Sequence, residues 1–133
     1  MRLATIKLNG AEIAGIVAKG GILPIHALNA AKGTAWKEEM LELIQAGQVP
    51  GLTQWYNQGG KDELETIPGL VPAEQVVYAP LYRHPKRIFG IGLNYAEHAG
   101  DIGNAPPTGF PGSFFKMPET LIGPGDTIKL PRL

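Results

Sequence analysis

The stretch that decides the fold of this chain is residues 88–101, which read Ile88-Phe89-Gly90-Ile91-Gly92-Leu93-Asn94-Tyr95-Ala96-Glu97-His98-Ala99-Gly100-Asp101. Its apolar beginning, Ile88 to Ile91, predicts a buried β-strand, because a short apolar run beside turn residues is typical of a strand with both faces covered. Residues 94–101 predict about two turns of helix. We therefore expect a buried strand that leads into a short helix.

The residues that follow this strand and helix are rich in turn formers. Residues 105–112 contain three prolines and two glycines and predict a loop. Residues 113–116 and 127–130 predict two further strands, with a turn at residues 123–126 before the second. Residues 84–133 therefore predict the beginning of a β-rich domain.

The first part of the chain predicts a small antiparallel meander. Residues 3–8 end at Asn9-Gly10, which is the strongest short hairpin signal, and residues 13–17 are the expected return strand. A second glycine-containing turn leads into residues 22–25, the expected third strand.

Two helices are expected after the meander, and both should cover one face of it. Four apolar residues recur at the spacing of one helical stripe: Trp36, Met40, Leu43 and Ile44. Thr34 is the expected N-cap of this helix, and Gly47 is its expected end. A second short helix is predicted between Pro50 and Gly59. The fold class is therefore α+β, with a small N-terminal domain over residues 1–83 and an incomplete β-rich domain over residues 84–133.

The composition narrows the class of partners. Twelve basic and twelve acidic residues cancel, so we expect no binding to nucleic acid or to anionic lipid. The absence of cysteine excludes a disulfide framework and thiolate metal sites. The sequence has no apolar run long enough to span a bilayer. We expect a cytoplasmic protein that binds a small molecule.

His98 and Asp101 are the candidate catalytic pair. Their spacing of three residues places both side chains on one face of a helix, within reach of each other. A carboxylate beside an imidazole fixes its tautomer and raises its basicity, as a general base requires. The same spacing is also typical of an ordinary polar helix, so the preceding strand and its glycines give the motif its specificity.

This arrangement resembles the opening of the catalytic domain of a fumarylacetoacetate hydrolase-family enzyme. The family pattern resembles "K-I-x-x-x-G-x-N-Y-x-x-H-x-x-E", a proline-rich loop, "F-x-K" and "G-P-x-x-x-I-x-L-P". The matching residues are Arg87 (basic, in place of Lys), Ile88, Gly92, Asn94, Tyr95, His98, Pro106, Phe114, Lys116, Gly123, Pro124, Ile128, Leu130 and Pro131. The resemblance implies a hydrolase, decarboxylase, hydratase or isomerase of a small 2-oxo acid, acylpyruvate or fumarylacetoacetate-like substrate.

The resemblance also implies roles for single residues. His98 moves the proton, and Asp101 orients it at a position where the family has Glu. The side chain of Asp is shorter than that of Glu by about 1.5 Å, which matters for a hydrogen bond near 2.8 Å. The implied substrate-binding residues are Arg87, Asn94, Tyr95 and Lys116, of which Tyr95 has the alternative role of a core residue.

The family binds Mg²⁺, Mn²⁺ or Ca²⁺ through an E-x-E pair and a later Asp, because hard cations need several converging oxygen ligands. The only E-x-E here is Glu63-Leu64-Glu65, which lies upstream of the resemblance, while Glu119 and Asp126 are expected in turns. We therefore expect no metal ligands in this chain, which is interpreted as the N-terminal domain and the first part of the catalytic domain. We expect a homodimer for the complete enzyme and no activity for the isolated chain.

Two alternatives stay open. In the first alternative, the chain is a non-catalytic assembly module or truncated remnant, whose last strand offers an open edge to a partner. In the second alternative, residues 1–84 form an independent binding domain. Only the meander and the two helices support it.

Overall fold

The structure, a computed structural model of the chain, describes residues 1–93, 95–101, 103, 109, 110 and 112–132; for residues 96 and 98 it describes the backbone. The described residues form two compact units. The first consists of Met1–Tyr82 and Ile122–Leu133, and the second of Arg83–Leu121. Among the described residues, no helix is long and apolar enough to cross a membrane. The predicted domain boundary at residues 83 and 84 stays a prediction.

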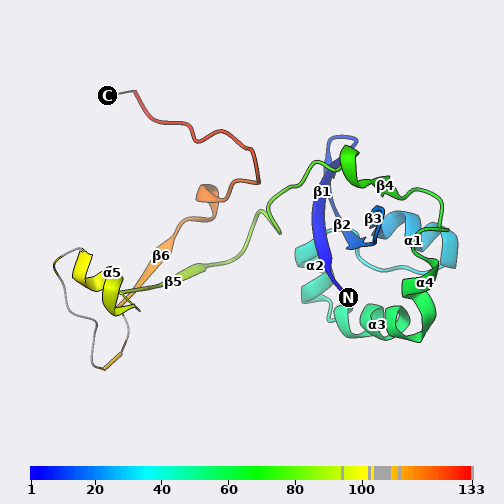
Figure 1. Cartoon of the computed structure of the whole chain (residues 1–133), viewed down its shortest axis with the longest axis horizontal. Coiled ribbons are helices and arrows are strands. Elements are labelled where there is room, and N and C mark those ends of the chain that lie inside the picture. Colours follow the sequence, from blue (N-terminus) through cyan, green and yellow to red (C-terminus); the bar gives the residue numbers. More distant parts are fainter. Residues whose placement is uncertain (94, 102, 104–108, 111, 133) are drawn as a thin grey trace. The chain divides into compact units, whose positions relative to one another are not determined.

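A four-stranded antiparallel sheet organises the first unit (Figure 1). Its strands follow the order β1 (Leu3–Leu8), β2 (Ala11–Val17), β3 (Gly21–Pro24) and β4 (Val71–Pro72). The turn between β1 and β2 has positive φ at both Asn9 (50°) and Gly10 (81°), as a tight hairpin with right-handed strand twist requires. The predicted meander is therefore confirmed, and it gains a short fourth strand from residues far along the chain.

Helices of the first unit pack on this sheet. They are α1 (Ile25–Lys32), α2 (Met40–Gln45), α3 (Val49–Trp55), the π-helical turn η1 (Tyr56–Gly60) and α4 (Lys61–Glu63). The core that they share with the strands consists of Ala14, Ile16, Leu23, Ile25, Ala27, Leu28, Met40, Leu43, Leu52, Leu64 and Ile67. The second predicted helix, between Pro50 and Gly59, corresponds to α3 and η1.

The first predicted helix is correct in part. It begins at Met40, because both carboxylate oxygens of Glu39 accept hydrogen bonds from the backbone N–H groups of Leu41 and Glu42. The expected cap, Thr34, instead donates its hydroxyl to the side chain of Asn29 at 2.9 Å. The expected stripe therefore breaks at both ends, with Trp36 ahead of the helix and Ile44 45 % exposed.

Helix α1 is not among the predicted elements. The strand predicted at residues 22–25 corresponds to β3 and ends at Pro24, one residue earlier than expected. The chain turns into the helix directly after Pro24, whose φ of −63° suits a helix entrance. Ile25, Ala27 and Leu28 are buried on one side of α1, so packing against the sheet stabilises a helix that carries no side-chain N-cap.

The C-terminal residues of the first unit form no strand in their described part, so the strand predicted at residues 127–130 is wrong. Ile128 is 71 % exposed and Leu130 is 84 % exposed, and no described strand pairs with them. The turn predicted before them is present: Asp126 accepts the backbone N–H of Gly123 at 2.7 Å and the ammonium of Lys7 at 2.6 Å. Side-chain contacts to β1 therefore hold this segment instead of a sheet ladder.

A short edge pairing joins residues 77–79 to β1. The N–H of Lys7 donates to the carbonyl of Val77 at 2.7 Å, and the N–H of Ala79 donates to the carbonyl of Thr5 at 2.9 Å. These bonds flank one isolated β-bridge between Ile6 and Tyr78.

The second unit is built on a two-stranded antiparallel ribbon. β5 (Ile88–Gly92) pairs with β6 (Gly112–Lys116), and helix α5 (Ala96–Asp101) follows β5. The predicted sequence of strand and short helix is therefore confirmed. The predicted burial is not, because Phe89 is 59 % exposed and Ile91 is 54 % exposed. A single ribbon covers neither of its own faces.

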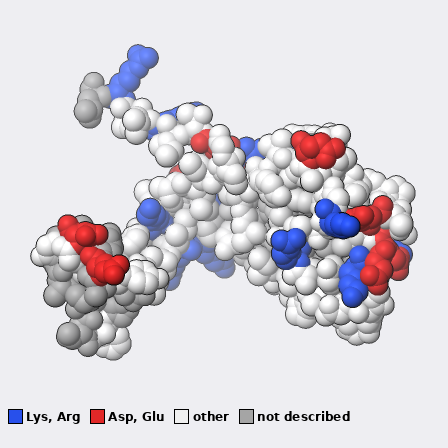
Figure 2. Space-filling view, in the orientation of Figure 1, with Lys and Arg blue, Asp and Glu red and all other residues white. Residues whose placement is uncertain are grey.

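Acidic and basic side chains lie side by side on the face of the molecule that Figure 2 shows, in keeping with equal numbers of the two signs.

Leu43 and Ile44 are neighbours in α2, and substitutions at these two positions test which residues form the core. Leu43 is fully buried, whereas Ile44 is 45 % exposed. We expect Leu43→Ala to lower the free energy of unfolding by about 2–5 kcal/mol, since it leaves a cavity, and Ile44→Ala to lower it by less than about 1 kcal/mol. Urea unfolding followed by the fluorescence of Trp36 and Trp55, which pack against the core, measures both. Equal effects would contradict this assignment of the core.

Candidate active site

The strand-to-helix connection at the end of β5 places the candidate catalytic pair. His98 and Asp101 both belong to α5, three residues apart, so their Cα atoms lie on one side of the helix. The helix starts with a hydrogen bond from the N–H of Ala99 to the carbonyl of Tyr95, at 3.0 Å. Ala99 is fully buried, whereas Asp101 is exposed. Because the side chain of His98 lies outside the description, the pairing of imidazole and carboxylate stays a prediction.

Leu93 holds the sharp turn between β5 and α5. Its φ of 56° lies in the left-handed region, which a bulky side chain rarely adopts. Such a conformation costs on the order of 1–3 kcal/mol and is often retained at functional sites. Sequence reasoning missed this residue, because nothing in a leucine signals a positive φ.

Arg87 and Lys116, both predicted to bind substrate, lie at one hollow of the second unit. The register places Ile88 opposite Lys116, so the two cations come from neighbouring positions of the ribbon. The hollow has a volume of about 530 Å³ and is lined by Lys86, Arg87, Ile88, Phe115, Lys116, Met117 and Pro118. Three cationic side chains beside apolar ones suit a small organic anion.

The structure places the two groups of candidate residues at opposite ends of the ribbon. Ile88 pairs with Lys116 at one end, and Gly92 pairs with Gly112 at the other end, next to α5 (Figure 1). Four residues of extended strand separate these ends, which corresponds to roughly 13 Å at about 3.3 Å per residue. Arg87 and Lys116 are therefore brought together at one end of the ribbon, whereas α5, the helix that carries His98 and Asp101, lies at the other end.

The remaining predicted substrate residues have different outcomes. Tyr95 is 73 % exposed, so its interpretation as a core residue is wrong. Its ring is available to a ligand, and its predicted role in binding stays a prediction. Asn94 lies outside the described residues.

The acidic residues of the Glu63-Leu64-Glu65 segment have other partners. Glu63 forms an ion pair with Lys32, and Glu65 accepts the backbone N–H of Gly20 at 2.7 Å. Among the residues whose side chains the structure describes, no three His, Asp or Glu side chains converge as metal ligands. The described donor set therefore does not fit the divalent cation that the family resemblance implies.

Comparison with known protein families finds a match for the C-terminal part of the chain. Residues 87–133 match the family described as fumarylacetoacetate (FAA) hydrolase C-terminal. This match covers β5, α5 and β6, together with Arg87, His98, Asp101 and Lys116.

Several proteins resemble the same part of the chain. An uncharacterized protein of Pyrococcus horikoshii is 50 % identical over 48 residues, which are 36 % of this chain and 20 % of that protein. A mitochondrial oxaloacetate tautomerase of Arabidopsis thaliana is 41 % identical over 51 residues, 38 % of this chain and 22 % of the relative. A mitochondrial oxaloacetate tautomerase of Rattus norvegicus is 34 % identical over 62 residues, 47 % of this chain and 20 % of the relative.

Residues 87–133 of the chain are therefore similar to the fumarylacetoacetate hydrolase family. The chain spans about a fifth of the length of the relatives it matches. The family resemblance therefore concerns this segment.

Substitutions at Leu93 test whether the left-handed turn positions α5. We expect Leu93→Val to weaken the helix by about 1–2 kcal/mol, because a β-branched side chain is least compatible with positive φ. Leu93→Asn is the matched control, because asparagine tolerates this conformation. Hydrogen exchange of the Ala99 amide, which donates to Tyr95, measures both, and we expect about tenfold faster exchange in the valine variant alone. Equal exchange rates in both variants would contradict the role of Leu93.

Proposed function

We propose that the natural protein containing this chain transfers a proton at the carbon next to the 2-oxo group of a small 2-oxo acid. The favoured reaction is keto–enol tautomerisation of a 2-oxo dicarboxylate such as oxaloacetate. One observation carries the proposal: the family-matched segment leads β5 through a left-handed turn into a helix that bears His98 and Asp101 at a spacing of three. Two relatives that match this segment are named oxaloacetate tautomerases.

The proposed chemistry needs one base and one orienting group. His98 takes the proton from the carbon, the electron pair of the C–H bond forms the enolate, and the same proton is returned to the enolate oxygen. Atoms and charge balance without a further reactant. Asp101 orients the imidazole and stabilises its protonated form between the two transfers.

Arg87 and Lys116 are proposed to attract the anionic substrate by their charge. Their hollow carries a third cation, Lys86, and such a cluster raises the local concentration of an anion. The ribbon separates this hollow from α5 by more than the length of a small 2-oxo acid, so these cations are not proposed to hold the molecule while His98 transfers its proton.

Hydrolysis of a C–C bond in an acylpyruvate is the second candidate, because the matched family is described as a hydrolase. The non-catalytic alternative, an assembly module, predicts that none of these reactions depends on His98. A cytoplasmic location and a homodimer stay predictions.

The test is the rate of oxaloacetate tautomerisation by the natural protein and by three variants. We expect His98→Ala to lower kcat by about 10²–10⁴-fold, the usual contribution of a general base. Lys116→Gln should raise KM by about two- to threefold with little change in kcat, because it removes one of three cations that attract the substrate. Glu97→Gln is the matched control, since Glu97 is an exposed neighbour in α5.

Unchanged kcat in the His98→Ala variant would overturn the proposed proton transfer. Loss of activity in Glu97→Gln to the same extent would show that the helix, rather than the imidazole, had been damaged. Acylpyruvate cleavage measured with the same variants separates the two candidate reactions.

Dependence on Mg²⁺ or Mn²⁺ stays a family-based proposal, and no step above is assigned to a metal. The described side chains form no ligand cluster. We therefore expect Mg²⁺ at about 5 mM, which exceeds the Kd of weak sites, to leave the urea midpoint of the 133-residue chain unchanged. EDTA should likewise leave it unchanged. A saturable rise of the midpoint with Mg²⁺ would identify a metal site within this chain.

A further inference from the structure

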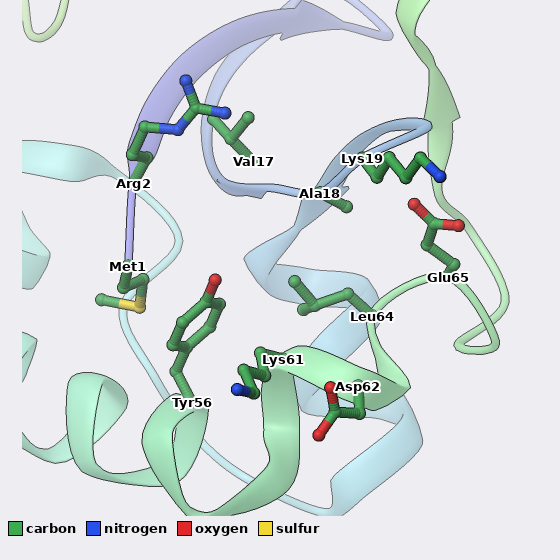
Figure 3. Close-up of a pocket in the computed structure, with 10 residues that line it drawn as sticks. All are labelled: Met1, Arg2, Val17, Ala18, Lys19, Tyr56, Lys61, Asp62, Leu64 and Glu65. Atoms are coloured by element: carbon green, nitrogen blue, oxygen red, sulfur yellow. The ribbon is translucent and has the colours of Figure 1, made fainter.

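A pocket of about 650 Å³ lies in the first unit, and none of its lining residues belongs to the family match (Figure 3). It is formed by the beginning of β1, the end of β2 with the turn that follows, and the chain from η1 through α4. Its lining residues are Met1, Arg2, Val17, Ala18, Lys19, Tyr56, Lys61, Asp62, Leu64 and Glu65.

Apolar residues form part of the wall. Leu64 is only 2 % exposed and belongs to the core, and Val17 and Ala18 are half-buried beside it. A ligand in the pocket can therefore remove apolar surface from water as well as make polar contacts.

Three of the six polar side chains that line the pocket are cationic, and these three, Arg2, Lys19 and Lys61, lack ion-pair partners among the described residues. The hydroxyl of Tyr56 makes no hydrogen bond within the described part of the chain, and Figure 3 shows it pointing toward the strand residues across the pocket. These groups offer donors to a ligand without first breaking a contact inside the protein.

The two carboxylates of the pocket do not cancel this excess. Glu65 already accepts the backbone N–H of Gly20 at 2.7 Å, so it holds the turn between β2 and β3. Asp62 is the second acid, so two carboxylates stand against three cations, Arg2, Lys19 and Lys61. The lining keeps an excess of one positive charge and therefore favours an anion.

An irregular turn brings Tyr56 and Lys61 to the same pocket. The π-helical turn η1 joins α3 to α4 with non-helical backbone angles at Gln58 and at Gly59, whose φ is 116°. Isolated π-turns are found frequently at functional sites, because they rotate the side chains on either side of them. Here the turn places a hydroxyl and an ammonium five residues apart in one cavity wall.

We propose that this pocket binds a small organic anion, with a carboxylate or phosphate group held by Arg2, Lys61 and Tyr56 and a short apolar body over Leu64, Val17 and Ala18. The site lies in the first unit, so the proposal does not rest on the proposed reaction. It assigns a binding function to residues 1–65, outside the family match.

Calorimetric titration of the full chain with four probes tests the proposal: acetate, benzoate, inorganic phosphate and phenyl phosphate. We expect benzoate or phenyl phosphate to bind saturably, and at least one of them more tightly than its head group alone, because only these probes reach the apolar wall. The tighter of the two identifies the head group. If neither benzoate nor phenyl phosphate binds saturably, the proposal is overturned, even if inorganic phosphate binds.

Variants of the pocket show where a bound probe lies. We expect Arg2→Gln and Lys61→Gln each to weaken binding about tenfold, the size of one charge-assisted contact. Tyr56→Phe should weaken it about fivefold, the size of one neutral hydrogen bond. Asp62→Asn should strengthen binding, because it removes one of the two repulsive charges, Asp62 and Glu65.

Matched controls lie in the same unit. Lys37→Gln removes an exposed cation outside the pocket, and Tyr78→Phe removes an exposed hydroxyl outside it, so both should leave binding unchanged. Binding that is equal in wild type, Arg2→Gln and Lys61→Gln would overturn the proposal. Binding that falls equally in Lys37→Gln would indicate attraction by the whole protein instead, and would overturn it as well.

Discussion

The burial of one face of the β1–β3 meander under three short helices is the constraint on which the first unit depends. None of these helices exceeds eight residues, a length at which an isolated helix is not stable in water. They persist because Leu28, Leu43 and Leu52 enter one core with the strands. The same packing fixes the chain on either side of η1, and therefore the positions of Tyr56 and Lys61.

The second unit has no comparable core, and its geometry comes from backbone register. Pairing of β5 with β6 brings Arg87 beside Lys116, although 28 residues lie between them along the chain. The same register sets these cations apart from α5. The hollow lined by Arg87 and Lys116 and the helix that carries His98 therefore lie at different ends of the ribbon, a separation that the sequence motif does not indicate.

The chain also divides between what the family explains and what it does not. The family match begins at Arg87, and its motifs lie on β5, α5 and β6. The cationic pocket lies among residues 1–65, where the match provides no assignment. An anion site there would give the N-terminal unit a ligand of its own, in line with the alternative that this region is a binding domain.

The sequence by itself determined the hairpin at Asn9-Gly10 and the order of strand and helix over residues 88–101, because both depend on local backbone preferences and periodicity. It also placed His98 and Asp101 on one helix. Only the tertiary structure decided that Glu39 rather than Thr34 caps α2, since the Thr34 hydroxyl donates to Asn29. It alone placed Arg87 near Lys116 and made Arg2 and Lys61 line one pocket, because the proximity of residues distant in the chain follows from register and packing.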